Sequence, residues 1–185
     1  MYAQIAPLDP NGELQHEWLN SRAAIARFDR DAIEIRLMDV QECPLADMAV
    51  ASLIVALVRS LAQAGNAAPE LDEGRLAAIL LSAMQAGEQA IIRDGEYLAR
   101  LGVESGEISG KELWLKILES LATGAPELAA FGEWHALYRS QGSLASRITG
   151  SLDGGVPSTQ GIRQSYRRLA ACLADGRLFQ LGSTA

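Results

Sequence analysis

Residues 32–38 of the chain read Ala32-Ile33-Glu34-Ile35-Arg36-Leu37-Met38. Apolar and charged side chains alternate along this stretch with the period of two that is typical of a half-buried β-strand. Glu34 and Arg36 therefore leave one face of the predicted strand, and the apolar side chains leave the other face. This is the one clear strand that the sequence predicts, and it places an anion beside a cation on a rigid element.

An apolar helix follows this strand. Pro44 suits the first turn of a helix because the N–H group that proline lacks is not needed there. The predicted helix covers residues 45–63 and is stopped by Gly65. Its apolar run, from Met48 to Val58, is shorter than the roughly 20 residues of a membrane span, so we expect a buried core helix.

The rest of the chain shows the apolar spacing of amphipathic helices. This spacing predicts helices over about 76–98, 110–121, 126–139 and 159–174, and a short helical turn at 143–148. Gly87 and Gly95 are possible kinks, and Ser109 with Glu112 has the spacing of a capping box. The expected fold class is therefore α+β and predominantly helical, with one strand and about five helices.

Composition limits the classes of function. The 185 residues are 49% hydrophobic and carry 16 basic against 23 acidic side chains, a net charge of −7. An acidic chain without a basic cluster is a poor nucleic-acid binder, and no secretory signal or membrane span is visible. Cys43 and Cys172 lack metal-ligand spacing, which indicates reduced thiols in a cytoplasmic protein.

The predicted strand has no obvious partner within the chain. A lone strand cannot satisfy its own backbone hydrogen-bonding groups. Residues 1–185 are therefore expected to be either a single domain or a C-terminal fragment of a larger α+β protein, with a strand-bearing segment at 1–44 and a helical segment at 45–185. The sheet would then be completed by another polypeptide.

The Glu34 and Arg36 pair suits a magnesium nucleotide. A carboxylate supplies a hard oxygen ligand for Mg²⁺, and a guanidinium group can hold phosphate oxygens through two hydrogen bonds. A cross-strand ion pair on a solvated sheet face is the alternative, and the three residues 34–36 alone favour it.

A longer stretch of the sequence favours a functional site over a solvated ion pair. Residues 28–44 and the apolar helix after them resemble the carboxyl-terminal part of the glutamate-cysteine ligase type 2 family, the carboxylate-amine ligases. Residues 17–22, 166–169 and 176–179 fit the same resemblance. The resemblance implies a glutamine-synthetase-like fold and an enzyme in which ATP phosphorylates a substrate carboxylate before an amine displaces phosphate.

The resemblance also implies roles for single residues. Glu34 would bind Mg²⁺, and Arg36 would contact the transferring phosphoryl group of ATP. Asn20 and Arg22 would contact substrate or nucleotide. Family members carry further acidic strands in an N-terminal half, so the chain is expected to be inactive alone and to need that half or a second copy as partner, with amino acids as substrates. The alternative is a non-catalytic helical domain that serves assembly.

Overall fold

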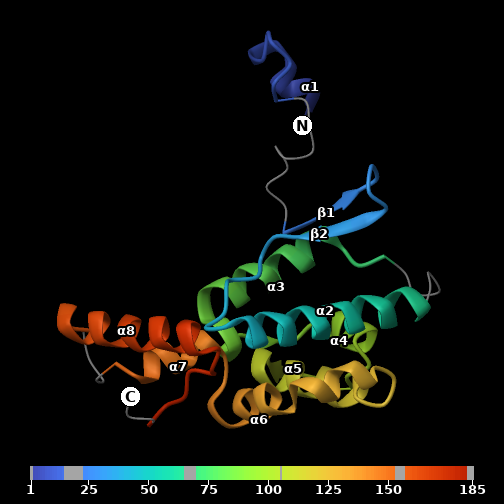
Figure 1. The fold of residues 1–185 in the computed structure, drawn as a ribbon. Helices are drawn as coiled ribbons and strands as arrows, with labels where there is room; N and C mark the ends of the chain where they lie inside the picture. Colours follow the sequence, from blue (N-terminus) through green and yellow to red (C-terminus); the bar gives the residue numbers. More distant parts are fainter. Residues whose placement is uncertain (1, 15–22, 65–69, 105, 153–156, 183–185) are drawn as a thin grey trace. The chain divides into compact units, whose positions relative to one another are not determined.

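The computed structural model describes residues 2–14, 23–64, 70–104, 106–152 and 157–182. These residues fall into two compact units, Met1–Val40 and Gln41–Ala185. The first unit contains a short helix α1 (Tyr2–Ile5), a 3-10 turn η1 (Ala6–Leu8) and two strands, β1 (Ala24–Arg27) and β2 (Ala32–Ile35) (Figure 1).

Strands β1 and β2 form an antiparallel hairpin in which Ile25 lies opposite Glu34 and Arg27 lies opposite Ala32. In the connecting turn, the Arg30 N–H group donates to the Arg27 carbonyl at 3.0 Å, and Asp31 takes a positive φ of 48°. Aspartate tolerates this conformation better than most residues. The expectation of a lone strand was therefore wrong, because residues 24–27 supply its partner.

The second unit is mainly helical. Its elements are, in order, α2 (Pro44–Ala64), α3 (Glu73–Ala86), η4 (Gly87–Gln89), β3 (Ile91–Ile92), α4 (Gly95–Arg100), β4 (Ile108–Ser109), α5 (Gly110–Leu121), η5 (Pro126–Phe131), α6 (Gly132–Gln141), α7 (Leu144–Gly150) and α8 (Thr159–Asp175). The predicted fold class, α+β and predominantly helical, is confirmed. The predicted strand at 32–38 is shorter than expected, because β2 ends at Ile35.

The helix predicted over 76–98 is interrupted. Gly87 has a φ of 55°, which ends α3 because L side chains rarely adopt that conformation. The chain then forms β3, which pairs antiparallel with β4 through Ile92 and Ile108. Two-residue strands carry too few side chains to produce an alternating pattern, so the sequence did not reveal them.

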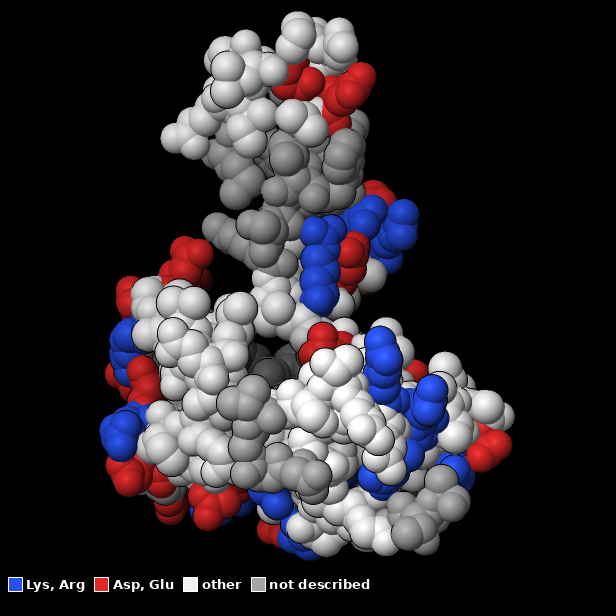
Figure 2. Space-filling model, turned by 90° about the vertical axis from the view of Figure 1, so that its left-hand side faces the viewer, with Lys and Arg blue, Asp and Glu red and all other residues white. Residues whose placement is uncertain are grey.

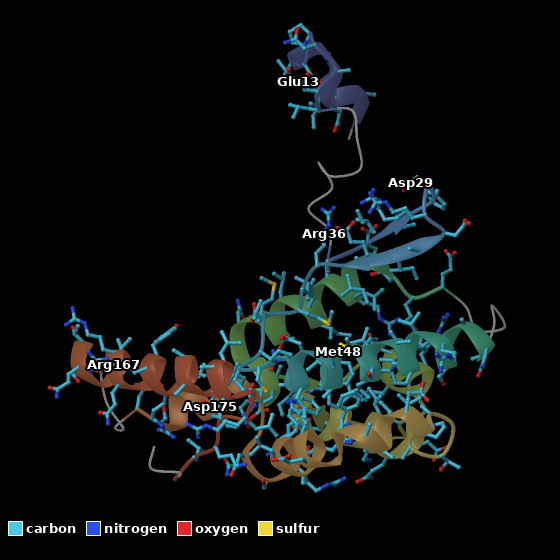
Figure 3. The ribbon with its side chains drawn as sticks, viewed as in Figure 1. Glu13, Asp29, Arg36, Met48, Arg167 and Asp175 are labelled. Carbon is cyan, nitrogen blue, oxygen red and sulfur yellow. The ribbon has the colours of Figure 1, made fainter. Side chains whose placement is uncertain are left out.

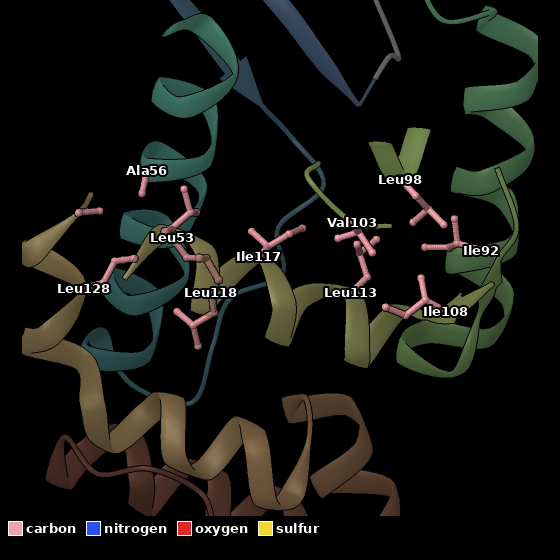
Figure 4. Close-up of a cluster of buried hydrophobic side chains, with 12 residues drawn as sticks. Leu53, Ala56, Ile92, Leu98, Val103, Ile108, Leu113, Ile117, Leu118 and Leu128 are labelled. Atoms are coloured by element: carbon pink, nitrogen blue, oxygen red, sulfur yellow. The ribbon is translucent and has the colours of Figure 1, made fainter. Parts of the chain in front are cut away.

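Helix α5 lies at the centre of the main hydrophobic core (Figure 4). Leu113, Ile117 and Leu118 of α5 pack with Leu53 of α2 and Leu98 of α4. The predicted capping box is confirmed: the Glu112 N–H donates to Ser109 Oγ, and the Ser109 N–H donates to the Glu112 carboxylate. This cap satisfies two backbone donors and fixes where α5 begins.

Helix α2 forms where the sequence predicted a buried core helix, but only part of its surface is buried. Its buried side chains follow one face and are Ala46, Ala49, Leu53 and Ala56. Met48 and Val55 are 57% and 54% exposed, so the expectation of a buried core helix holds for one face only. By length and composition α2 could cross a membrane, and only 22% of its most apolar stretch is buried; core helices of soluble proteins pass the same test.

The second unit also contains a buried ion pair. Arg147 Nη1 donates to Glu42 Oε1 at 2.6 Å, and the two side chains are 2% and 0% exposed. The backbone of Phe179 joins them: its carbonyl accepts from Arg147 and its N–H donates to Glu42 Oε1. Cys43, the residue after Glu42, belongs to a second hydrophobic core and is a free thiol. The C-terminal segment is thereby fixed to the start of α2.

Candidate functional site

The hairpin brings charged side chains together across its two strands. Glu34 lies in β2, and Arg36 follows directly after the end of that strand. The Arg36 N–H donates to the Ala23 carbonyl at 2.8 Å, so the backbone pairing continues to this residue. Arg27 lies at the end of β1, two residues beyond the position opposite Glu34. Diagonal neighbours at this spacing are within reach of long side chains.

The carboxylate of Glu34 lies between two guanidinium groups. Its Oε1 accepts a hydrogen bond from Arg36 Nε at 2.8 Å, and its Oε2 accepts one from Arg27 Nη1 at 2.8 Å. The side chains are partly exposed, at 38% for Glu34, 28% for Arg36 and 15% for Arg27. The prediction that Glu34 and Arg36 lie on one face therefore agrees with the structure.

Asp29 extends this cluster from the turn of the hairpin. Its carboxylate accepts from Arg27 Nε at 3.2 Å and from Arg27 Nη2 at 3.4 Å. Arg30 also donates to Asp29, at 3.3 Å. Figure 3 labels Asp29 at the turn and Arg36 beyond the end of β2, and Figure 2 shows basic and acidic side chains of the first unit side by side. We call Asp29, Arg27, Glu34 and Arg36 the hairpin charge row.

The arginines keep both carboxylates ionised. Hydrogen bonds from Arg27 and then from Arg36 lower the pKa of Glu34. The hydrogen bond from Arg27 is also the main reason that the pKa of Asp29 is lowered. A hydrogen bond donated to a carboxylate favours its charged form, so the row holds alternating full charges at neutral pH.

A magnesium site does not follow from the described residues alone. No group of three His, Cys, Asp or Glu side chains among them could hold a metal ion. Each oxygen of Glu34 already accepts a hydrogen bond from a guanidinium group. Because Mg²⁺ needs several oxygen ligands in an octahedral arrangement, Glu34 would need ligands from outside the described residues, and its role as a metal ligand stays a prediction.

Two further residues were predicted to belong to the site. Asn20 and Arg22 lie outside the described residues, so their predicted roles remain predictions. Arg27 was missed by the sequence reasoning. The signal that could have found it is position along the chain: the mostly apolar segment Ala24-Ile25-Ala26-Arg27 precedes the predicted strand and is separated from it by a short turn containing Asp29.

Comparison with known proteins adds the family context. The sequence model of glutamate-cysteine ligase family 2 (GCS2) matches residues 4–149, a range that includes the hairpin. The chain is 38% identical over 78 residues to an uncharacterized protein of Archaeoglobus fulgidus, and this match covers 42% of the chain and 20% of the archaeal protein. No solved structure matches the chain.

Proposed function

This chain belongs to glutamate-cysteine ligase family 2, and from that membership we propose that it is the C-terminal segment of an ATP-dependent carboxylate-amine ligase. The match to the family, which spans the hairpin charge row, is the observation that carries this proposal. The substrates are small amino acids, of which glutamate and cysteine are the first to test. Nucleic acids and membranes are not among the proposed partners.

The proposed reaction has two group-transfer steps. A carboxylate oxygen of the substrate attacks the γ-phosphorus of ATP, an acyl phosphate forms, and ADP leaves with the electron pair of the broken P–O bond. The amine then attacks the acyl carbon, inorganic phosphate leaves, and the amine loses its proton as the amide forms. Catalysis of such a step depends on positioning and on stabilising the charge of the phosphoryl group.

Arg36 is the residue that we propose for contact with the phosphoryl group. Its guanidinium group is planar, always charged and suited to phosphate oxygens. It is held through Nε by Glu34 at 2.8 Å, while its side chain is still 28% exposed. A held cation that solutes can reach is what a phosphate-binding role requires. Asn20 and Arg22 remain proposed contacts for substrate or nucleotide.

ATP and Mg²⁺ are part of the proposal because the family resemblance implies them. When bound with ATP, Mg²⁺ would neutralise phosphate charge. The described residues supply no complete site for the ion, so we assign no step of the reaction to it.

We propose further that the site is completed by a second polypeptide segment, so that the chain is inactive alone. The same 78 residues make up 42% of this chain and 20% of the archaeal relative, so that relative is about twice as long. Within the described residues, β1 and β2 pair only with each other. An upstream N-terminal half of the ligase, pairing with this small sheet, would supply the missing acidic strands.

The direct test measures ADP release from ATP and Mg²⁺ in the presence of glutamate and cysteine. The chain is assayed alone and together with the N-terminal half, taken from the neighbouring reading frame or from a longer family member. We expect turnover only with both parts, and a loss of about 100-fold or more in Arg36→Ala. Arg30→Ala, which removes an equal charge from the turn, is the control. Full activity of Arg36→Ala would contradict the assignment.

A second candidate function is assembly without catalysis, and one observation favours it. Helix α3 has no buried residue, and its Leu81 and Met84 are 57% and 67% exposed. On α2, Met48 and Val55 are 57% and 54% exposed. Exposed apolar faces of this kind are typical of surfaces that contact another chain. Light scattering separates the candidates: a stable homo-oligomer with no ADP release in either assay would favour the assembly function.

We also propose that the protein works in the cytoplasm. Both cysteines are free and buried, and free thiols are typical of a reducing compartment. Fractionation of cells that express the tagged chain tests this proposal, and recovery in the membrane fraction would contradict it.

A further inference from the structure

Helix α8 is fixed to the second unit along one side. It begins beyond residue 149, where the match to the family model ends. Ser165 and Cys172, which lie two helical turns apart on one face, are both buried. The Ser165 Oγ lies 2.9 Å from Ser151 Oγ, within hydrogen-bond distance. The opposite side of α8 is therefore held in a fixed position, and it lies outside the family match.

The opposite side of α8 exposes large apolar side chains. Ile162, Tyr166 and Leu173 are 41%, 63% and 59% exposed, and their spacing places them on one face of the helix. Ala170, which is also exposed, lies on this face between Tyr166 and Leu173. We call these four residues the α8 stripe. A single exposed apolar residue is ordinary, whereas a continuous row of them marks a contact surface.

Two arginines follow one edge of the α8 stripe. Arg163 and Arg167 are one helical turn apart and both are exposed; Figure 3 labels Arg167. Among the described residues, none forms a hydrogen bond or an ion pair with either of them. Other exposed arginines of the second unit do have a carboxylate partner: Arg59 pairs with Glu127, and Arg139 pairs with Glu119. The edge of the α8 stripe thus carries two positive charges that the described part of the chain leaves without a counter-charge.

A second copy of α8 would not supply the missing counter-charge. In a symmetric antiparallel pair packed through the α8 stripe, the arginine edges of the two helices lie on the same side of the interface. Like charges repel each other there. In a parallel pair, each arginine edge would meet the other edge of the stripe, at Leu169, which carries no acid. Charge therefore disfavours a second α8 as the occupant of the stripe.

A lipid surface fits the α8 stripe less well than a protein does. Amphipathic helices that lie on membranes are rich in lysine and arginine across their whole polar face. On α8 the two unpaired arginines lie along one edge only, and the chain has a net charge of −7. Anionic headgroups would therefore repel the chain as a whole.

We infer that the α8 stripe is a docking surface for an acidic amphipathic helix of another polypeptide. Apolar side chains of that helix cover Tyr166 and Leu173, and its carboxylates pair with Arg163 and Arg167. Paired helices use the same division of labour, in which an apolar seam holds the helices together and charges along its edge select the partner. From Ile162 to Leu173 the stripe is about 17 Å long, so about three turns of the partner helix cover it. The inference does not depend on the ligase proposal.

The first experiment titrates two synthetic helical peptides of about 18 residues into the ¹⁵N-labelled full chain. Both carry leucine along one face; the first has glutamate along both edges of that face, and the second has glutamine there instead. We expect amide shifts at the α8 stripe and binding of the glutamate peptide at least about tenfold tighter than that of the glutamine peptide. Equal affinities would overturn the choice of an acidic partner. No binding of either peptide at about 1 mM, or shifts only outside α8, would overturn the docking surface.

Variants of the chain separate the two parts of the surface. Arg163→Glu and Arg167→Glu should each weaken binding of the glutamate peptide by about fivefold. Arg93→Glu, the same charge reversal at an exposed residue outside α8, is the matched control and should have little effect. Tyr166→Ser should weaken binding by about tenfold because it removes the most exposed large apolar side chain of the stripe. If Arg93→Glu weakens binding as much as Arg167→Glu does, net charge and not the stripe is responsible, and the inference fails.

Two further measurements test the other occupants. Light scattering of the chain alone would identify a second copy as the occupant if it showed a dimer that Tyr166→Ser dissociates. Sedimentation with phosphatidylglycerol vesicles would identify a lipid surface if the chain were pulled down and Arg167→Glu were not. Either result would overturn the inference. Failure of the ligase assay would leave it intact, because peptide binding at α8 is measured without ATP or amino-acid substrates.

Discussion

Two glutamates of this chain bind arginine in different surroundings. Glu42 and Arg147 are 0% and 2% exposed, and the backbone of Phe179 hydrogen-bonds to both, although Glu42 Oε2 and Arg147 Nε remain buried without a partner among the described residues. Glu34 is 38% exposed and is shared by two arginines that solvent can reach. The first pair joins the start of α2 to α7 and the C-terminal segment, whereas the second lies on a hairpin.

The difference shows how burial separates structural ion pairs from candidate functional ones. In a dry interior, removing one partner leaves a charge that neither water nor protein satisfies. At a partly exposed site, water replaces the lost partner and the change in stability is small. A solute such as phosphate can also replace it. The hairpin charge row is therefore in contact with solvent, and the Glu42 pair is not.

The largest expected effect is loss of stability in Arg147→Met. This substitution leaves Glu42 buried without its cation, which costs about 3–5 kcal/mol. Urea unfolding followed by circular dichroism measures the change. The comparison with the hairpin predicts that Arg36→Met, a chemically identical substitution at the exposed site, moves the urea midpoint far less.

A double variant checks the cause. In Arg147→Met with Glu42→Gln, the uncompensated charge is gone, so the double variant should regain a large part of the stability lost in Arg147→Met. Strictly additive losses would show that packing, and not the stranded charge, dominates at this site.

A smaller effect is expected from Arg168→Ala. The Arg168 guanidinium lies over the Phe179 ring at 4.7 Å from its centroid, and it donates to the Gln180 carbonyl at 2.9 Å. Loss of both contacts should destabilise the second unit by about 1–2 kcal/mol in urea unfolding. Arg167→Ala, at the exposed neighbouring position, is the control. Equal midpoints in the two variants would show that the C-terminal segment does not depend on Arg168.

Acid should loosen the hairpin. The pKa values of Glu34 and Asp29 are lowered in the folded state, chiefly by hydrogen bonds from Arg27. Their contribution to stability is present above the unfolded-state pKa values and is lost as the pH falls through the lowered ones. Hairpin amide shifts recorded against pH should show this transition, and it should shrink in Glu34→Gln. A transition of unchanged size in that variant would exclude Glu34 as its source.

The smallest effect is expected from salt. At about 1 M ionic strength the screening length is about 3 Å, so exposed ion pairs weaken while buried ones are largely unaffected. The Arg27 and Arg36 Nε–H signals should shift toward those of unpaired arginine as sodium chloride is added, and the Arg147 signals should not. A parallel response of both sites would remove the distinction between them.

The sequence predicted features that depend on neighbouring residues. The capping box of Ser109 and Glu112, the shared face of Glu34 and Arg36 and the short helix α7 all appear where the pattern placed them. Each depends on side chains within four residues, where spacing alone fixes the geometry. The apolar face predicted for the strand is not buried, because Ile33 is 60% exposed. The role of Gly87 was only partly anticipated, because its positive φ ends the helix instead of bending it.

The cluster around Glu34 could be predicted only in part. Glu34 and Arg36 are two residues apart, so the period of the strand placed them on one face. Arg27 reaches Glu34 from the other strand, across a turn, and the short β1 segment was not recognised as a strand. The predicted burial of α2 failed on one face for a similar reason, since an apolar run does not say which of its sides meets another element.

What the sequence determined by itself is the local plan: one alternating strand, a series of amphipathic helices, and the caps and glycines that bound them. The tertiary structure alone decided which charges from separate elements meet. Glu42 and Arg147 are 105 residues apart along the chain, and Arg27 becomes a partner of Glu34 only when the hairpin closes. Local patterns report the geometry of one element at a time, whereas burial and ion pairing depend on how separate elements come together.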